Sequence, residues 1–312
     1  MSEVKKIATR ASYGSALVEL GKEHEDLIVL DADLAAATQT GMFKKEFPDR
    51  HIDCGIAECN MIGIAAGLAT TGKVPFASTF AMFAAGRAFE IIRNSIGYTR
   101  ANVKICATHA GITVGEDGAS HQTFEDLALM RTIPGMTVVN PGDAFSTAEL
   151  MKQVVEMQGP CYVRLGRAAV PALYEEGAEI KLGKGNWIRR GKDITVVATG
   201  IMVSEAVAAA AELSSQGIDA GIIDMHTIKP LDEEILVEAA SIGPVVTAEE
   251  HSVIGGLGGA TAEVLCRRNP VRMAMVGQHD TFGESGKPDE LKEKYGMTSA
   301  DIAKAVKSLL NR

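Results

Sequence analysis

Residues 103–122 read VKICATHAGITVGEDGASHQ, and this stretch says more about function than any other part of the chain. It opens with a strand-like apolar run and continues into a polar loop, so the loop leaves a strand where open α/β sheets place their ligands. The loop holds two histidines, two acidic residues and three glycines: His109, His121, Glu116, Asp117, Gly111, Gly115 and Gly118. Histidines titrate near neutral pH, and glycines let a backbone approach a ligand closely. We interpret it as a ligand-binding loop; an ordinary polar surface loop is the alternative.

Outward from this loop, helix-like and strand-like patterns alternate along the chain. The expected helices cover residues 11–23, 41–47, 59–70, 83–98, 124–131, 144–157, 202–215, 233–241, 257–268 and 299–310. The expected strands cover residues 27–31, 51–54, 74–78, 103–107, 136–139, 161–165, 194–198, 219–224, 245–248 and 271–276. Strands that alternate with helices imply crossover connections and a parallel sheet.

The alternation breaks down once, in a segment that carries proline, glycine and charged residues. Such a segment is typical of an interdomain linker. The sequence therefore predicts two three-layer α/β domains, at residues 1–168 and 193–312, joined by a linker at 169–192.

The composition bounds the class of protein. Of 312 residues, 46% are hydrophobic and 23% are charged, as in a soluble globular protein with an ample core. No apolar run approaches the ~20 residues of a membrane helix, and the start MSEVKKIATRAS lacks the apolar region of a signal peptide. We therefore expect a cytoplasmic protein without a membrane partner. The net charge of −9 argues against nucleic acid as the main partner, and five cysteines without a C-x-x-C pair indicate reduced, structural thiols.

Glu58 follows a short predicted strand and opens a helix that reads ECNMIGIAAGLATTG. A carboxylate at a helix N-terminus gains about 0.3–1 kcal/mol from the helix dipole, which is the purely structural explanation. The small residues of this helix predict close packing against another element, including one from a second subunit. An interface that buried Glu58 would let it act as an acid as well as a base.

Other candidate residues lie beside predicted strands or helices. Phe80 and Phe83, in STFAMF, are either core residues or a stacking wall for a flat heteroaromatic ring. Arg167 ends CYVRLGR, and Arg10 precedes the first helix. Lone arginines are usually solvated, whereas arginines that converge at strand ends form anion clamps with charge-assisted hydrogen bonds.

Six motifs now stand in order along the first half: IATRAS, DADLAA, GIAECNMIGIAAGLA, STFAMF, GEDGASHQ and GPCYVRLGR. Together they closely resemble the pyrimidine-binding domain of transketolase. The second half resembles the transketolase C-terminal domain in its ITVVATG start. Its TIKPLDEE and EEHSVIGGLGG segments are similar to deoxyxylulose-phosphate synthases and 2-oxoacid dehydrogenase β subunits. The resemblance covers essentially the whole chain and implies the C-terminal subunit of a split transketolase.

The resemblance implies a thiamine diphosphate cofactor and assigns residues to it. Glu58 matches the catalytic glutamate that hydrogen-bonds the aminopyrimidine ring and promotes its imino tautomer. Phe80 and Phe83 match the aromatic pocket around that ring, and Asp33, in DADLAA, is placed with the cofactor-binding residues. Gly86 stands where a third aromatic is usual, so the stacking wall is incomplete or is supplied from elsewhere.

The same resemblance assigns residues to the donor sugar. His121 matches the histidine beside the donor's carbonyl and hydroxyl groups, and we expect it to be catalytic. Asp117 matches the aspartate that contacts the sugar hydroxyls. His109, Arg10 and Arg167 match the groups that hold the sugar phosphate.

Three further features depart from the family pattern. Ala37 replaces a phosphate-contacting serine, and Ala110 with Gly111 replaces a more polar pair. Glu116-Asp117-Gly118 is not the GDG motif through which the family binds Mg²⁺ and the diphosphate. No triad of hard oxygen ligands is visible, so we expect no metal ligands here. Mg²⁺ and the diphosphate should instead be bound by a separate N-terminal, diphosphate-binding subunit in an α2β2 complex.

The expected function is thus that of a transketolase subunit, which transfers a two-carbon ketol unit between phosphorylated sugars and is active only with its partner. Two alternatives remain open: the β subunit of a 2-oxoacid dehydrogenase, and a non-catalytic homologue that keeps the fold. The two histidines of the loop and Arg167 favour the sugar enzyme. The joint presence of Glu58, His121 and Asp117 argues against a non-catalytic homologue.

Overall fold

A computed structural model describes residues 6–311, and within them the main sheet of the first half has seven strands. The strands are β2 (Leu27–Asp31), β3 (His51–Asp53), β4 (Val74–Phe80), β5 (Lys104–Thr108), β6 (Thr137–Val139), β7 (Cys161–Arg164) and β12 (Thr227–Lys229). Their order is β12-β6-β7-β5-β4-β2-β3, and every pair is parallel except β12 with β6. The parallel sheet that the alternating pattern predicts is confirmed.

Helices cover both faces of this sheet. They are α1 (Thr9–Glu23), α2 (Ala35–Thr38), α3 (Gly41–Glu46), α4 (Glu58–Ala69), α5 (Phe89–Ile91), α6 (Asp126–Thr132) and α7 (Ala144–Glu156). Shorter helical turns are η1 (Pro48–Arg50), η2 (Met82–Arg87), η3 (Ile92–Gly97) and η4 (Ile112–Asp117). One core joins α1, α3 and α7 to the sheet through residues such as Leu17, Phe43 and Leu150; the other joins α4 and α6 through Met61 and Leu127.

The second half repeats the plan around a five-stranded sheet of order β14-β13-β10-β11-β9. Its strands are β9 (Asn186–Arg189), β10 (Ile194–Ala198), β11 (Ala220–Asp224), β13 (Val245–Ser252) and β14 (Met273–Gln278), with only β9 antiparallel. Its helices are α8 (Met202–Ser215), α9 (Glu233–Ile242), α10 (Leu257–Arg268), α11 (Pro288–Lys294) and α12 (Ser299–Leu310). Helices α8 and α12 share a third core, whereas residues of α9 and α10 belong to the core that also contains α4 and α6.

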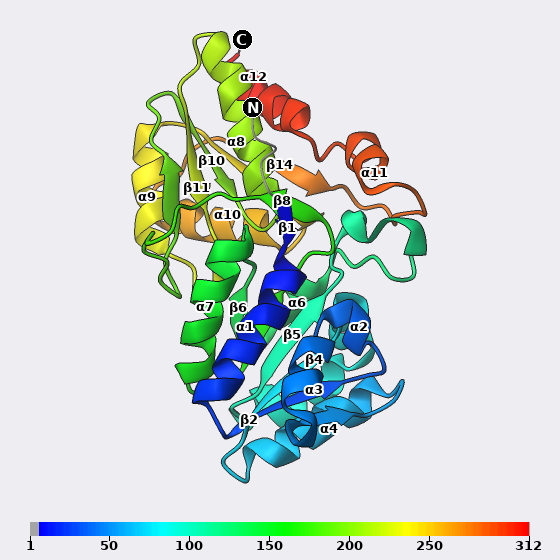
Figure 1. Cartoon of the computed structure of the whole chain (residues 1–312). Coiled ribbons are helices and arrows are strands. Elements are labelled where there is room, and N and C mark those ends of the chain that lie inside the picture. The colour runs from blue at the N-terminus through cyan, green and yellow to red at the C-terminus, as the bar shows by residue number, and fades with distance from the viewer. Residues whose placement is uncertain (1–5, 312) are drawn as a thin grey trace.

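The two halves are joined by more than the chain between them. Strand β12, from the second half, adds to the edge of the first sheet beside β6. Strands β1 (Lys6–Ala8) and β8 (Ala169–Pro171) form a two-stranded sheet, and Figure 1 shows this pair between the lower and the upper halves of the molecule. One apolar core also runs through both halves, from Ile105 of β5 to Leu257 of α10.

The structure differs from the sequence prediction at several elements. The predicted helix 83–98 is two wide turns of π-helix, η2 and η3, on either side of α5. The predicted linker contains β8 and β9, which are too short for a periodic pattern to reveal. Helices α2 and α11 were not predicted. The predicted domain boundaries at residues 168 and 193 stay a prediction. The predicted first and last residues of the two domains, 1 and 312, lie outside the described residues. Across residues 6–311, no helix is long and apolar enough to span a membrane.

Candidate functional site

The carboxyl ends of the central strands carry the predicted site residues. Phe80 is the last residue of β4, His109 directly follows β5, and Arg167 lies three positions beyond β7. Neighbouring parallel strands end at one edge of the sheet, so their terminal residues meet there. Arg10, in the first turn of α1, reaches the same edge, because its backbone N–H donates to Gly166 O at 3.4 Å.

The aromatic rings and the two loop histidines form one cluster. The rings of Phe80 and His109 stack with their centroids 3.9 Å apart, and those of Phe80 and Phe83 stack at 5.8 Å. His121 lies edge-on to Phe83 at 5.2 Å and to Phe80 at 6.2 Å. This cluster, Phe80, Phe83, His109 and His121, is called the ring cluster below. Offset and edge-on contacts of this kind suit the ring quadrupoles.

His109 is a neutral histidine with an assignable tautomer. Arg10 Nη1 lies 3.3 Å from its Nε2 atom, and a guanidinium can only donate, so Nε2 accepts. The ring proton is therefore on Nδ1, which donates to Thr108 Oγ1 at 2.8 Å. Burial, together with the charges of Arg10, Arg167 and His121, lowers the pKa of His109 to about 3. His109 thus offers one donor and one acceptor without a charge at neutral pH.

Two guanidinium groups converge beside His109. Arg10 Nη1 donates to Ala37 O at 2.7 Å, so the backbone at Ala37 orients it although the side chain there is only a methyl group. Burial and the nearby Arg167 lower the pKa of Arg10. Arg167 Nη1 bonds Glu116 Oε2 at 2.8 Å and the carbonyl oxygen of Val114. The half-exposed Arg167 is therefore tethered to the loop by an internal carboxylate.

Glu58 is the first residue of α4 and is 2% exposed. Its Oε2 atom accepts from Arg87 Nη1 at 2.8 Å, and the guanidinium carbon of Arg87 lies 5.1 Å from the centre of the Phe83 ring. Arg87 thus links Glu58 to the ring cluster. Sequence reasoning missed Arg87, because the π-helical turn η2 that aims it cannot be read from periodicity.

The glycine that replaces the third aromatic lies in the same turn. A Cβ atom at Gly86 would lie 2.7 Å from Met82 Cε, so methionine fills the space beside it. The group over the Phe83 ring is Arg87, which adds a cation–π contact in place of a further ring.

The small-residue flank of α4 faces outward. Gly63 and Gly67 are exposed, and a Cβ atom at either position would meet nothing within 4 Å. The tight packing predicted for this flank is therefore not made within the described part of this chain.

Two predicted residues lie apart from the ring cluster. Asp117 is exposed at the end of η4. Asp33 is exposed with φ 60°, and its backbone N–H donates to Asp53 Oδ1 at 3.1 Å. Among the described residues, neither side chain forms a hydrogen bond or ion pair with the ring cluster.

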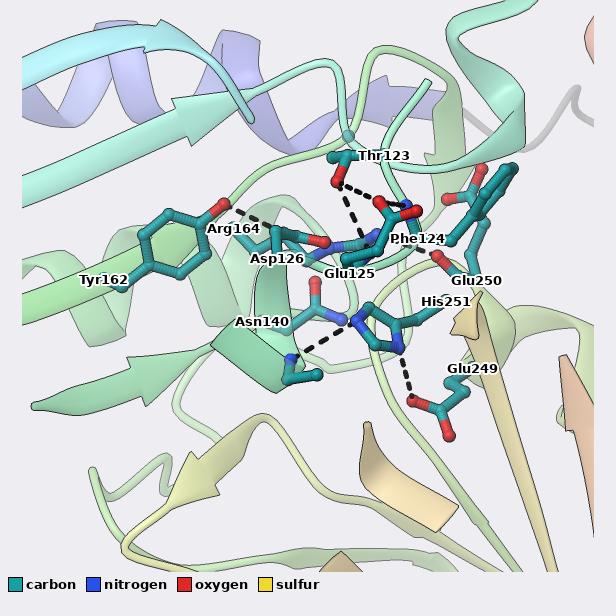
Figure 2. Close-up of polar contacts among 12 residues, drawn as sticks. Thr123, Phe124, Glu125, Asp126, Asn140, Tyr162, Arg164, Glu249, Glu250 and His251 are labelled. Carbon is teal, nitrogen blue, oxygen red and sulfur yellow. Dashed lines mark hydrogen bonds and ion pairs between the residues drawn. The ribbon is translucent and has the colours of Figure 1, made fainter. Parts of the chain in front are cut away.

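A second polar group lies buried where the halves meet, and sequence reasoning did not single it out as functional. Asp126 Oδ2 accepts from Tyr162 Oη and from Arg164 Nε, each at 2.8 Å, and Arg164 Nη2 donates to Glu250 O at 2.8 Å. Figure 2 shows these side chains with Glu249 and His251 of the same strand as Glu250. The available signal was the acidic pair Glu249-Glu250, which directly follows the predicted strand 245–248 and is buried in β13.

Metal ligands are not grouped in the described chain. Within residues 6–311, no cluster of three or more His, Cys, Asp or Glu side chains could hold an ion. The side chains at the sheet edge suit a heteroaromatic ring and an anion, because they offer two stacked phenyl rings, a buried carboxylate and two guanidinium groups.

Transketolase family profiles and curated transketolase relatives match this chain over almost its whole length. Residues 5–172 match the family profile of the transketolase pyrimidine-binding domain, and residues 183–302 match that of the transketolase C-terminal domain. The chain is 44% identical to the 6-deoxy-6-sulfo-D-fructose transketolase subunit of Clostridium sp. (strain MSTE9) over 304 residues, 97% of this chain and 94% of the relative. It is 36% identical to human transketolase over 312 residues, 98% of this chain but 50% of the human protein.

A solved structure shares the fold over almost its full length. It is a split-gene transketolase in an inactive beta4 tetramer, with a TM-score of 0.92, 55% identity, and coverage of 98% of this chain and 99% of that one.

Proposed function

The chain belongs to the transketolase family as a C-terminal, split-type subunit, and on that premise we propose how it works. It binds the aminopyrimidine half of thiamine diphosphate and the donor sugar, while a separately encoded subunit binds Mg²⁺ and the diphosphate. Together the two chains transfer a two-carbon ketol unit between phosphorylated sugars. The transketolase names of the matched relatives favour this activity over that of a 2-oxoacid dehydrogenase β subunit.

One observation carries the proposal: Glu58, Arg87, the ring cluster and Arg10 form a continuous series of contacts at one sheet edge. The contacts run from Glu58 through Arg87 to Phe83, and from Phe80 through His109 to Arg10. A buried carboxylate at one end and guanidinium groups at the other match a substrate that reacts at a ketone and ends in a phosphate.

The residues present fit the aminopyrimidine half of the cofactor. Glu58 is a buried carboxylate linked to Phe83 through Arg87, and the Phe80–Phe83 pair provides flat apolar surface. When bound, thiamine diphosphate supplies the carbon nucleophile that carries the two-carbon unit. Glu58 holds the ring nitrogen and exchanges a proton with it, which requires Arg87 to leave or share the carboxylate. Asp33 is proposed as a further cofactor contact near the end of β2.

The donor sugar lies against the loop in this proposal. His121, edge-on to Phe83, is the proton-exchanging group beside the carbonyl and hydroxyl groups. Neutral His109 hydrogen-bonds without titrating, and Asp117 reaches the sugar hydroxyls. Arg10 and Arg167 hold the phosphate, and Arg167 exchanges its bond to Glu116 for one to the substrate.

Residues 6–311 hold no group of three or more His, Cys, Asp or Glu side chains that could bind a metal ion, which supports a Mg²⁺ site supplied from elsewhere. We place its ligands on the partner and propose an α2β2 complex, with the open flank of α4 facing a partner surface. Small residues at an interface allow backbones to approach closely.

Reconstitution tests the proposal. The purified chain alone should show no ketol transfer and only weak thiamine diphosphate binding by titration calorimetry. Adding the diphosphate-binding subunit should restore both, with a dependence on Mg²⁺. Robust Mg²⁺-dependent ketol transfer by the chain alone would refute the two-subunit assignment.

A further inference from the structure

The second half of the molecule touches the substrate loop directly. Thr113, in the loop, donates its backbone N–H to Glu250 Oε1 at 2.6 Å across the boundary between the halves. Gln122 Nε2, at the other end of the loop, donates to Glu284 O at 2.9 Å. Both ends of the segment between His109 and His121 are therefore held by residues of the second half, namely Glu250 in β13 and Glu284 after β14.

The loop backbone is shaped to receive the Glu250 carboxylate. Gly111 has φ 79°, a conformation that favours glycine. A Cβ atom at that position would lie 2.6 Å from Cγ of Glu250, so only a glycine lets the loop lie so close. Glycine at 111 satisfies both the backbone angle and the space that Glu250 leaves.

The backbone of Glu250 is held in place by a hydrogen bond from the first half. Glu250 lies in β13 and is 3% exposed, and its backbone oxygen accepts from Arg164 Nη2 at 2.8 Å. Arg164 is held by Asp126 on the first half, as Figure 2 shows. Burial raises the pKa of Glu250, while Arg164 and the Thr113 N–H act in the opposite direction. A buried carboxylate held in this way has little freedom to move, so it transmits its position to Thr113.

We propose that Glu250 is a positioning residue of the substrate site, through which the second half of the chain fixes the loop that carries His109, Asp117 and His121. Its contact is the Thr113 N–H, not the substrate. The identity of the substrate rests on the proposed transketolase activity, but the placement of the loop does not.

Glu249 provides a matched control on the same strand. It is fully buried, and its carboxylate accepts from the N–H groups of Leu257 and Gly258 at 2.6 and 2.7 Å. These donors belong to α10, within the second half. Glu249→Gln therefore perturbs a buried carboxylate of equal burial without touching the loop.

The first experiment is hydrogen–deuterium exchange on the full chain alone, so it is independent of catalysis. Glu250→Gln weakens a charge-assisted hydrogen bond to a neutral one, so we expect about tenfold faster exchange in peptides spanning residues 110–124. Glu249→Gln should leave these peptides unchanged and speed exchange at the start of α10. Equal protection of the loop in the wild type and Glu250→Gln would overturn the proposal.

Gly111→Ala keeps the proposal testable if Glu250→Gln does not fold. The added methyl group must push the loop off an intact Glu250, so the same peptides should lose protection while β13 keeps it. Unchanged protection of the loop in this variant would also overturn the proposal.

The second experiment uses the reconstituted complex and inorganic phosphate as a competitive probe. Glu250→Gln should raise the phosphate inhibition constant and the KM for the phosphorylated donor about tenfold, with thiamine diphosphate affinity unchanged, because Glu58 and Phe83 lie on other segments. Glu249→Gln should leave these three values alone. If the wild-type complex transfers no ketol unit, the proposed function fails while the exchange result stands. If the wild-type complex does transfer the ketol unit, and Glu250→Gln has the wild-type phosphate inhibition constant and donor KM, the positioning role is refuted.

Discussion

His109→Asn should reduce the loss of folding free energy that the chain suffers when the pH falls below 6.5. The His109 ring is 3% exposed, and burial with the charges of Arg10, Arg167 and His121 lowers its pKa to about 3. In the unfolded chain the same ring titrates near 6.5. Between these values the unfolded state binds the proton and the folded state does not. The stability contribution is therefore complete above pH 6.5 and is lost as the pH falls towards 3.

The size of the stability loss follows from how far the pH lies below the unfolded-state pKa of His109. At pH 5 the unfolded ring is protonated and the folded ring is not, across about 1.5 pH units at 1.36 kcal/mol each, so folding loses about 2 kcal/mol between pH 7 and pH 5. Asparagine does not titrate and loses none of this. Loss of the ring stack on Phe80 should lower stability at both pH values alike, by about 0.5–1.5 kcal/mol.

Urea unfolding of the isolated chain at pH 7 and pH 5 measures the difference. Other buried groups that titrate in this range, including Asp224, whose pKa burial raises to about 7, contribute to both proteins and cancel. The free energy of unfolding should fall by about 2 kcal/mol more in the wild type than in His109→Asn. Equal losses in the two proteins would show that His109 is protonated in the folded chain, and the tautomer assigned from Arg10 would then be wrong.

Three further predictions concern the reconstituted complex. Glu58→Gln should lower kcat by at least ~10²-fold while thermal unfolding stays near the wild type, since positioned proton-transfer groups contribute ~10²–10⁴-fold; near-normal turnover would remove Glu58 from the chemistry. Arg167→Ala should raise KM far more for phosphorylated than for unphosphorylated donors, because lost ground-state binding appears there; equal changes for both would contradict a phosphate clamp. Arg87→Met should tighten thiamine diphosphate binding in calorimetry several-fold, because the cofactor no longer displaces a half-exposed ion pair worth about 0.2–1 kcal/mol; weaker binding would mean that Arg87 contacts the cofactor itself.

Local patterns in the sequence were sufficient to predict the strands and helices that their own residues determine. The apolar runs at β2, β4 and β5 alternate with helices, and this alternation alone implies a parallel sheet with ligand residues at one edge. His109 and Phe80 meet there because their strands are neighbours in the sheet. The family motifs then supplied what spacing could not, namely the roles expected for Glu58 and His121.

What the sequence could not predict depends on contacts between distant segments. Strand β12 has three residues, too few for a periodic signal, and its place beside β6 is set by the other half of the chain. The Arg87–Glu58 pair depends on a π-helical turn, which carries no 3.6-residue pattern. Glu250 reaches Thr113 over a separation of 137 residues, and nothing in either local sequence predicts the meeting.

Strand β12 has a consequence for biosynthesis. The edge of β6 has its partner only after residue 229 has been made, because Lys229 closes the pairing. During translation the earlier strands leave the ribosome with one row of backbone groups unpaired and with the apolar face later shared with α10 uncovered. Open strand edges and bare apolar faces promote association with other chains. A fragment cut at the apparent domain boundary would keep both defects permanently, so we expect the two halves to fold as one unit although they have the form of two domains.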